Sequence, residues 1–285
     1  RYGYEMTIET ARFWNSRLEW IEENNRYEIR DVIGPDEYKE HVDNNAYTNY
    51  MAHENMRLAA QVIACIRDEK KDIYGKMQKL MQEEGTSLEQ LEEELKDKMK
   101  KLYLPQPDEK TGIIPQFDGY FDLKEIDLSV YKNASVVGTV FHDYSGEDVQ
   151  KMQAGKQADI VELLYQMEDI TTPDNKAKNY VYYEARTLHD SSLSKAIHSI
   201  TACDLGMEKE AYDMFMSAAL TDLGQEMKSS DAGIHSANMG GVWQDVVMGF
   251  GGIRIRDGHL RIAPNCPKQW EKFTYCLLYT SPSPR

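Results

Sequence analysis

The sequence is poor in cysteine and contains no long apolar run. Its 285 residues include four cysteines that lie far apart and form no Cys-x-x-Cys pair, namely Cys65, Cys203, Cys266 and Cys276. This spacing indicates neither a zinc site nor a disulfide framework, and it favours a reducing, cytoplasmic location. A membrane span needs about 18 consecutive apolar residues, and no such run is found. The first residues also lack the basic and then apolar pattern of a signal peptide.

Basic residues are too few to balance the acidic ones. The chain has 33 Lys and Arg against 48 Asp and Glu, a formal net charge of −15. Such a charge repels nucleic acids and anionic membranes and argues against partners of either kind. We therefore expect a small ligand. If that ligand is an anion, local donors must hold it, such as helix N-termini, hydroxyls, imidazoles and backbone amides.

Apolar residues recur at helical spacing through most of the chain. The pattern predicts helices over about residues 8–21, 46–73, 87–102, 147–168, 192–205 and 208–222. Thr86-x-x-Glu89 reads as a capping box for the third helix, and Gly206 as the stop of the fifth. Residues 104–121 are predicted to be a loop-rich connection. The chain is therefore predicted to be mainly α.

The pattern changes after residue 245. Two alternating runs, 253–256 and 259–262, flank Asp257-Gly258 and predict a β-hairpin. We expect a helical domain over residues 1–245 and the start of a β domain over 246–275. Residues 276–285 abandon the pattern, resemble translated sequencing adaptor and are predicted to be a non-native tail. Because the chain opens without Met, we expect the natural N-terminus to lie upstream.

A carboxylate-rich turn over residues 33–49 is the most informative stretch. Gly34 and Pro35 set the backbone of a rigid turn, and Asp36-Glu37 leave it shortly before a helix opens near residues 43–44. Glu37 is our candidate proton donor for cleaving a glycosidic bond. It must stay protonated near neutral pH, which partial burial beside Asp36 favours. Glu40 is the competing carboxylate, and taken alone the turn also fits a solvated loop.

Two further segments could hold an anion. Ser191 and Ser192 lie at the start of a predicted helix, where hydroxyls and free N–H groups favour an anion, although ordinary N-capping is the more common role of such serines taken alone. His235 stands close before Gly240-Gly241, so an imidazole and exposed backbone amides could converge. A lone histidine is, however, more often structural, and paired glycines more often form a turn.

Four segments in order resemble the inverting disaccharide phosphorylases of glycoside hydrolase family 65. They are residues 33–49, Lys156-Gln157-Ala158-Asp159, the run from Arg186 to Ser194 and the run from Gly233 to Gly241. The resemblance implies the later part of an (α/α)₆ barrel followed by the start of a small β-sandwich. One departure is Ala232, because family members often carry an acidic residue just before Gly-Ile-His.

The resemblance also implies roles for individual residues. Glu37 would be the proton donor, and Lys156 and Gln157 would bind the sugar ring that becomes glucose 1-phosphate. The phosphate-binding residues would be Ser191, Ser192, His235, Gly240 and Gly241. His189 and Asp190 would orient their neighbours.

The implied reaction is phosphorolysis of an α-glucosyl disaccharide to β-glucose 1-phosphate and glucose, and the resemblance favours maltose as the substrate. Trehalose and kojibiose are the alternative substrates. Rival functions are a hydrolase on the same fold, which needs a second carboxylate as base, and a non-catalytic carbohydrate-binding fragment. No metal or organic cofactor is implied, since inorganic phosphate is the co-substrate. A homodimer is expected at full length, and little activity is expected from residues 1–275 alone.

Overall fold

The computed structural model describes residues 3–132, 136–224, 233–256 and 259–275. Ala232, the Asp257-Gly258 turn and the predicted tail 276–285 lie outside these ranges. The chain forms two compact units. Unit 1 comprises Arg1–Glu125 with Gln150–Gln153, and unit 2 comprises Ile126–Val149 with Ala154–Arg285.

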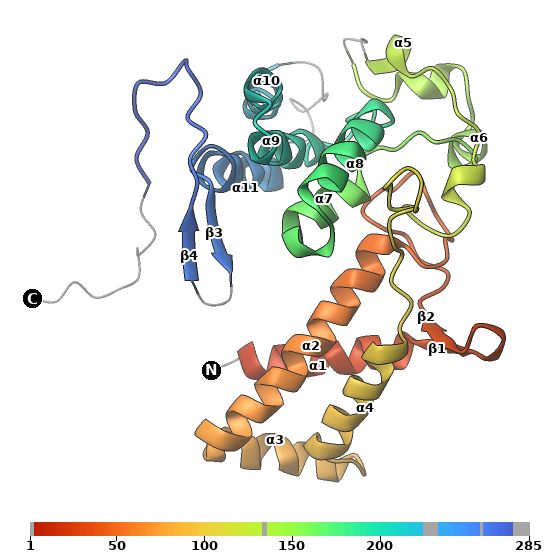
Figure 1. Ribbon diagram of the computed structural model, residues 1–285, viewed down its shortest axis with the longest axis vertical. Coiled ribbons are helices and arrows are strands. Elements are labelled where there is room, and N and C mark those ends of the chain that lie inside the picture. The colour runs from red at the N-terminus through yellow and green to blue at the C-terminus, as the bar shows by residue number, and fades with distance from the viewer. Residues whose placement is uncertain (1–2, 133–135, 225–232, 257–258, 276–285) are drawn as a thin grey trace, which may run out of the picture. The chain divides into compact units, whose positions relative to one another are not determined.

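Unit 1 is built on four helices (Figure 1). In chain order its elements are α1 (Gly3–Arg17), β1 (Glu19–Ile21), the 3₁₀ helix η1 (Glu22–Asn24), β2 (Arg26–Glu28), α2 (Ala46–Glu69), α3 (Lys71–Glu83), α4 (Leu88–Lys101) and the 3₁₀ helix η2 (Tyr120–Asp122). Helix α2 packs against α1 and α4. The apolar core between them includes Ile8, Met56, Ile63 and Leu95, which are fully buried.

Local signals explain most boundaries in unit 1. The Asn45 side chain accepts a hydrogen bond from the Thr48 amide and begins α2. Helix α4 begins one residue later than its predicted capping box, because Ser87 and not Thr86 accepts from the Gln90 amide. The predicted helix 8–21 is wrong in its last turn. There Trp20 belongs to β1, where its ring packs edge-on against Tyr27.

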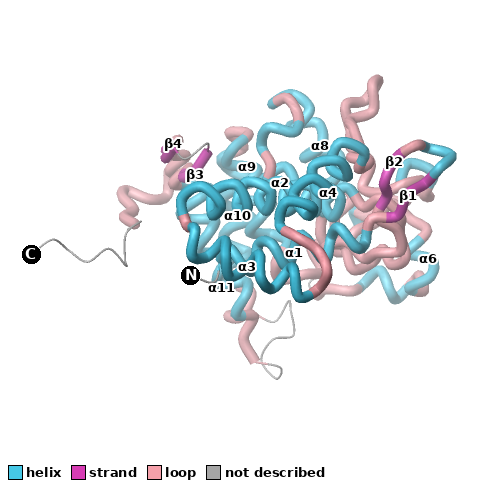
Figure 2. Tube along the Cα trace, turned by 90° about the horizontal axis from the view of Figure 1, so that it is seen from below, coloured by secondary structure: helices cyan, strands magenta, loops and turns pink. Residues whose placement is uncertain are grey.

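Unit 2 is also mainly helical, as the tube in Figure 2 shows. Its elements are α5 (Ser129–Lys132), η3 (Thr139–His142), α6 (Gly146–Gln150), α7 (Asp159–Gln166), η4 (Glu168–Ile170), α8 (Pro173–Ala185), α9 (Ser194–Asp204), α10 (Glu208–Ala219), α11 (Ser236–Gln244), the π-helix η5 (Asp245–Phe250), β3 (Ile253–Arg256) and β4 (His259–Ile262). Helix α9 contacts α7, α10, α11 and η5. The predicted mainly α class is confirmed.

The helix predictions in unit 2 were partly right. Helices α9 and α10 are confirmed, and Gly206 ends α9 at φ +70° with its amide bonded to the Cys203 carbonyl. The single helix predicted over 147–168 is wrong, because α6 and α7 are separated by a connection in which Gly155 pairs with another segment. Helix α8 was missed, although Thr172 caps it and Pro173 opens it.

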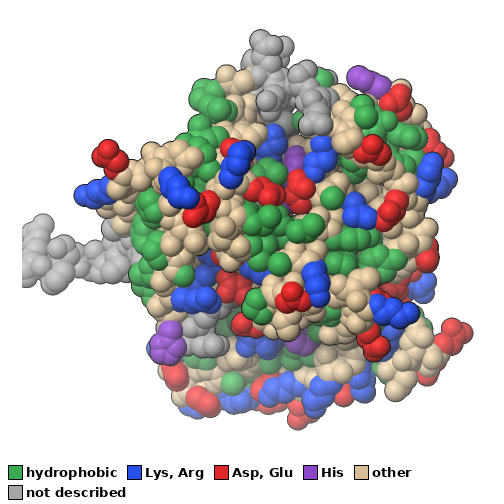
Figure 3. All heavy atoms as spheres, turned by 45° about the horizontal axis from the view of Figure 1, so that its top comes forward, with side chains coloured by type: hydrophobic (Ala, Val, Ile, Leu, Met, Phe, Trp, Pro, Cys, Tyr) green, Lys and Arg blue, Asp and Glu red, His purple; other side chains and the backbone are tan. Residues whose placement is uncertain are grey.

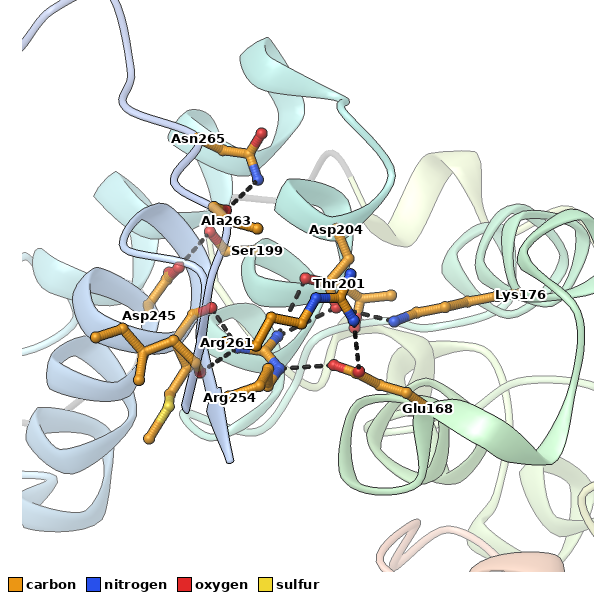
Figure 4. A network of polar contacts seen from close by, with 12 residues as sticks. Glu168, Lys176, Ser199, Thr201, Asp204, Asp245, Arg254, Arg261, Ala263 and Asn265 are labelled. Carbon is orange, nitrogen blue, oxygen red and sulfur yellow. Dashed lines mark hydrogen bonds and ion pairs between the residues drawn. The ribbon is translucent and has the colours of Figure 1, made fainter. Parts of the chain in front are cut away.

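The predicted hairpin is confirmed, with Ile253 opposite Ile262 and Arg256 opposite His259. Arg254 of β3 is buried, and its guanidinium lies 2.7 Å from a Glu168 oxygen and 3.1 Å from an Asp204 oxygen (Figure 4). These ion pairs attach the hairpin to the helices of unit 2. Residues 246–250, expected to open the β region, instead lie in η5. The domain boundary after residue 245 stays a prediction.

Charges of both signs lie interspersed on the face drawn in Figure 3. Within the described ranges, no helix is both long and apolar enough to cross a bilayer.

Candidate active site

The acid turn of unit 1 is closed at its base and buried on one side. Val32 and Val42 exchange two backbone hydrogen bonds of 3.0 Å, which clamp the ends of the loop between them. Within it the Lys39 amide donates to the Asp36 carbonyl at 3.0 Å, so residues 36–39 form a β-turn. The Asp36 side chain is fully buried and accepts from the Tyr38 amide at 3.2 Å. A turn held in this way presents Glu37 at its tip.

Glu37 is exposed, so the partial burial expected for it is not found in unit 1. The buried carboxylate of the pair is Asp36. Gln116, in a connection 80 residues away, donates a hydrogen bond of 3.1 Å to it. Gln116 is itself buried and supports the acid turn. Glu40 is exposed as well.

A buried lysine holds the far side of the turn. Lys39 is 1% exposed, and its Nζ donates to the carbonyls of Met152 at 2.6 Å and Gln150 at 3.3 Å. Burial lowers the Lys39 pKa to about 8, although nearby Asp36 opposes this change. The turn is thus attached to unit 1 on both sides of Glu37, which the sequence did not reveal.

Two motif segments of unit 2 lie side by side. Gly155 and Thr187 form a parallel bridge, in which the Gly155 amide donates to the Arg186 carbonyl and the Leu188 amide to the Gly155 carbonyl, each at 2.9 Å. Lys156 and Gln157 therefore lie next to the segment that leads to Ser191. Both of these polar residues are half-buried, just before α7 begins.

Ser191 and Ser192 lie in a turn immediately before α9, whose first residue is Ser194. Neither serine is the N-cap, because Leu193 occupies that position and no side chain caps the helix. Ser191 Oγ accepts only a local hydrogen bond, from the Leu193 amide at 3.3 Å. Capping, the simpler explanation for this pair, is therefore not what the structure shows.

Buried histidines support the same helix start. His189 Nδ1 lies 2.9 Å from Ser194 Oγ, and His198 Nδ1 lies 2.9 Å from the Ser194 carbonyl oxygen. Burial lowers the pKa of both imidazoles, that of His198 to about 3, so both rings are neutral. On the other side of His189, Glu184 pairs with Lys132 at 2.6 Å. Burial raises the Glu184 pKa, but hydrogen bonds from His189 and Lys132 outweigh it and lower the value to about 2.

His235 is fixed by a carboxylate that the sequence did not indicate. The two oxygens of Asp222 accept from the His235 amide at 2.8 Å and from Nδ1 at 2.7 Å. Gly233, just before it, has φ +97°, a conformation that favours glycine. His235 is also the N-cap position of α11, and no side chain caps this helix either.

Gly240 and Gly241 do not form the loop with exposed amides that was predicted. Both lie inside α11, where backbone amides are bonded along the helix. A Cβ on Gly241 would approach that of Ala196 in α9 to 3.1 Å, whereas a Cβ on Gly240 would meet nothing within 4 Å. Their small size allows the helices to approach closely at Gly241 and leaves open space at Gly240.

That open space is a pocket of about 380 Å³ between α7, α9 and α11. Three predicted residues line it together, namely Gln157, Gly240 and Gly241. The pocket is also lined by residues for which the sequence predicted no binding role, including Glu162, Ser194, His198 and Trp243. Lys156, Ser191, Ser192 and His235 are close in sequence to lining residues but do not line the pocket themselves, and Glu37 belongs to unit 1.

The pocket lies at helix starts that suit an anion. Helices α7, α9 and α11 all begin without a side-chain cap, so no capping side chain accepts a hydrogen bond from their first N–H groups. The first turns of α9 and α11 contain no acidic residue, whereas that of α7 contains Asp159 and Glu162. Helix dipoles therefore favour an anion at α9 and α11, whereas the carboxylates of Asp159 and Glu162 oppose one at α7.

Residues 1–244 match the family model described as "Glycosyl hydrolase family 65 central catalytic domain". The chain is 46% identical over 277 residues to kojibiose phosphorylase of Halothermothrix orenii, covering 97% of this chain and 34% of that protein. It is 34% identical to nigerose phosphorylase of Lachnoclostridium phytofermentans over 97% of this chain and 37% of that protein. With α,α-trehalose phosphorylase of Thermoanaerobacter brockii the identity is 37%, over 98% of this chain and 35% of that protein. The chain thus spans about a third of the length of these relatives.

A solved structure of a human-microbiome protein, provisionally named kojibiose phosphorylase, is also similar. Its TM-score is 0.81 at 30% identity, over 95% of this chain and 38% of that one. Together with the helices described above, these matches are consistent with the predicted partial (α/α)₆ barrel.

Proposed function

Because the chain belongs to glycosyl hydrolase family 65, we propose that its full-length protein is a glycosyltransferase-type phosphorylase. In this proposal phosphate attacks the anomeric carbon of an α-glucosyl disaccharide with inversion, while Glu37 protonates the departing oxygen. The products are β-glucose 1-phosphate and glucose. Inorganic phosphate is the co-substrate.

The observation that carries the proposal is the pair of helix starts at α9 and α11. Both lack a capping side chain and an acidic first turn, and each is next to hydroxyl or imidazole donors, from Ser191 and Ser192 at α9 and from His235 at α11. Such an arrangement supports phosphate binding in a chain whose net charge of −15 opposes it.

The start of α7 suits the sugar better than the phosphate. Its first turn carries Asp159 and Glu162, which repel an anion, and Glu162 lines the pocket, where it can accept hydrogen bonds from hydroxyl groups. Gln157 lines the same pocket and offers both a donor and an acceptor. These features support the sugar-binding role proposed for Lys156 and Gln157.

Kojibiose is the substrate we now propose first. The sequence pattern favoured maltose, but the relatives reported above are named for kojibiose, nigerose and trehalose. Identity to two proteins named kojibiose phosphorylase reaches 46% and 39%. Maltose is retained as an alternative. The homodimer, the cytoplasmic location and the lack of nucleic-acid partners stay predictions.

The test is glucose 1-phosphate formation by the full-length protein from kojibiose, nigerose, trehalose and maltose, with and without phosphate. We expect phosphate-dependent product from kojibiose and its loss in Glu37→Gln, which removes the proton donor but keeps the side-chain shape. Glu40→Gln is the matched control, and it should keep the activity. If Glu40→Gln instead abolishes turnover and Glu37→Gln does not, the assignment of the acid is wrong.

A hydrolase is the second candidate, and one observation favours it. An imidazole held by a carboxylate, as His235 is by Asp222, can also serve as a general base for water. Glucose release at the same rate without phosphate would support this function over phosphorolysis. No turnover of any sugar would support the non-catalytic alternative.

A further inference from the structure

We propose that Asp222 is a positioning residue for phosphate, which fixes the His235 imidazole in one orientation and one tautomer. This inference rests on the proposed phosphorolysis. Asp222 follows the end of α10, 13 residues before the histidine that it contacts. No motif in the sequence pointed to it.

The contact is a two-point one. One Asp222 oxygen accepts from the His235 backbone amide at 2.8 Å, and the other lies 2.7 Å from Nδ1. The Asp222 side chain is 11% exposed and the His235 side chain 30% exposed. Because the backbone and the ring are bound by the same carboxylate, rotation of the imidazole would break one of two charge-assisted hydrogen bonds.

The carboxylate also determines which ring nitrogen carries the proton. An ionised carboxylate only accepts hydrogen bonds, so Nδ1 must be the donor. Nε2 is then left for the ligand. As imidazolium, His235 can donate from Nε2 to a phosphate oxygen, and as neutral imidazole it can accept from a phosphate hydroxyl. The opposite tautomer would place the Nδ1 lone pair against the carboxylate.

A second contact supports the same helix start. The Asn238 side chain is fully buried and donates to the Ala218 carbonyl of α10 at 2.8 Å. The beginning of α11 is thus held on the end of α10 at two places, by Asn238 and by Asp222. Since both Asp222 oxygens already accept from His235, this carboxylate is better suited to orienting the histidine than to activating water directly.

The test uses Asp222→Asn in the full-length protein, with Asp213→Asn as the matched control. Asp213 is an exposed residue of α10 and pairs only with solvent-facing Lys209 among the contacts described. For Asp222→Asn we expect the KM for phosphate to rise by about 10- to 100-fold, the range found when the partner of a metal-ligating histidine is removed. The KM for the disaccharide should not change, and Asp213→Asn should change neither constant. Asp222→Glu, which keeps the carboxylate, should recover part of the loss.

A double-mutant cycle separates positioning from general damage. In a His235→Asn background, Asp222→Asn should have no further effect on the phosphate KM, because the group it orients is gone. Nitrogen NMR of selectively labelled histidine should show the proton on Nδ1 of His235 in the unsubstituted protein and a shift toward Nε2 in Asp222→Asn.

Three results would overturn the inference. They are an unchanged phosphate KM in Asp222→Asn, equal losses in both backgrounds, and a neutral His235 imidazole in the unsubstituted protein whose single proton is on Nε2. If the unsubstituted protein releases glucose without needing phosphate, the proposed function itself fails and the phosphate role fails with it. The NMR measurement would still decide whether Asp222 sets the tautomer.

Discussion

Asp245 is expected to make the protein less stable as the pH rises. Replacing it with asparagine should remove most of this pH-dependent loss of stability. Asp245 is fully buried at the start of η5, with one oxygen 2.9 Å from Ser199 Oγ (Figure 4). The same hydroxyl lies 2.7 Å from the Ala211 carbonyl. Serine has one proton to share between these two acceptors, so a neutral Asp245 can donate to Ser199 Oγ while Ser199 donates to the Ala211 carbonyl.

The sign follows from the pKa. Burial raises the Asp245 pKa from 3.8 to about 8, although a hydrogen bond donated by Ser199 to the ionised carboxylate acts in the opposite direction. The folded chain therefore binds more protons than the unfolded chain between pH 4 and pH 8, and stability falls as the pH rises through this window. At pH 7 the interval above the unfolded value is about three pKa units, or about 4 kcal/mol at 1.36 kcal/mol per unit. Relaxation around the buried anion makes this an upper limit.

Asparagine can reproduce the neutral arrangement, since its amide donates to Ser199 while Ser199 donates to the Ala211 carbonyl. We expect Asp245→Asn to be more stable than the unsubstituted protein by about 1.6 kcal/mol at pH 5, where the pH lies about 1.2 pKa units above the unfolded value, and by a larger margin at pH 8.5. Urea unfolding followed by circular dichroism at pH 5, 7 and 8.5 gives the three free energies of unfolding. Asp213→Asn, at an exposed position of unit 2, is the control and should show no such divergence. An equal loss of stability in Asp245→Asn at every pH would refute the reasoning, because the ionised carboxylate would then be what the fold requires.

Three further predictions test the helices and the acid turn. Burial lowers the Lys39 pKa in the folded chain from 10.5 to about 8, so between these pH values the unfolded chain binds more protons than the folded one. The free energy of unfolding should therefore rise by about 3 kcal/mol from pH 8 to pH 10.5. Lys39→Met should abolish this rise in urea unfolding. Gly240→Ala should stabilise α11 by about 0.5–1 kcal/mol in thermal unfolding. Gly241→Ala should stabilise it less, because the new Cβ would lie 3.1 Å from that of Ala196. Equal stabilisation by both substitutions would contradict the close approach of the two helices. Asn45→Ala should cost about 1 kcal/mol by removing the cap of α2, and an unchanged unfolding midpoint would show that the Thr48 amide has another acceptor.

Elements specified by neighbouring residues were predictable. Helices α9 and α10 follow their apolar periodicity, Gly206 ends α9 as its position suggests, and the hairpin after residue 252 follows its alternation. Where two signals overlapped, the prediction was off by one residue or one turn, as at Ser87 and Trp20. Helix α8 was missed because its apolar face is too irregular to stand out.

Parts of the candidate site were also predictable, because motif segments carry their residue types in a recognisable order. Gln157, Gly240 and Gly241 do line one pocket. The reason given for the glycines was wrong, however, since they lie within α11 and not in a loop. A glycine pair looks the same in sequence whether it allows a turn or a close approach of two helices.

The sequence by itself determined the local conformations and the kinds of residues that meet at the helix starts. Only the tertiary structure decided which polar groups are buried and what they pair with. Asp36 and Glu37 are neighbours, yet the first is buried and accepts from Gln116, while the second is exposed. Asp222 likewise contacts His235 from 13 residues away, and no local sequence pattern predicts this contact. Burial and charge pairing depend on which distant segments pack against a residue, and that follows from the path of the whole chain.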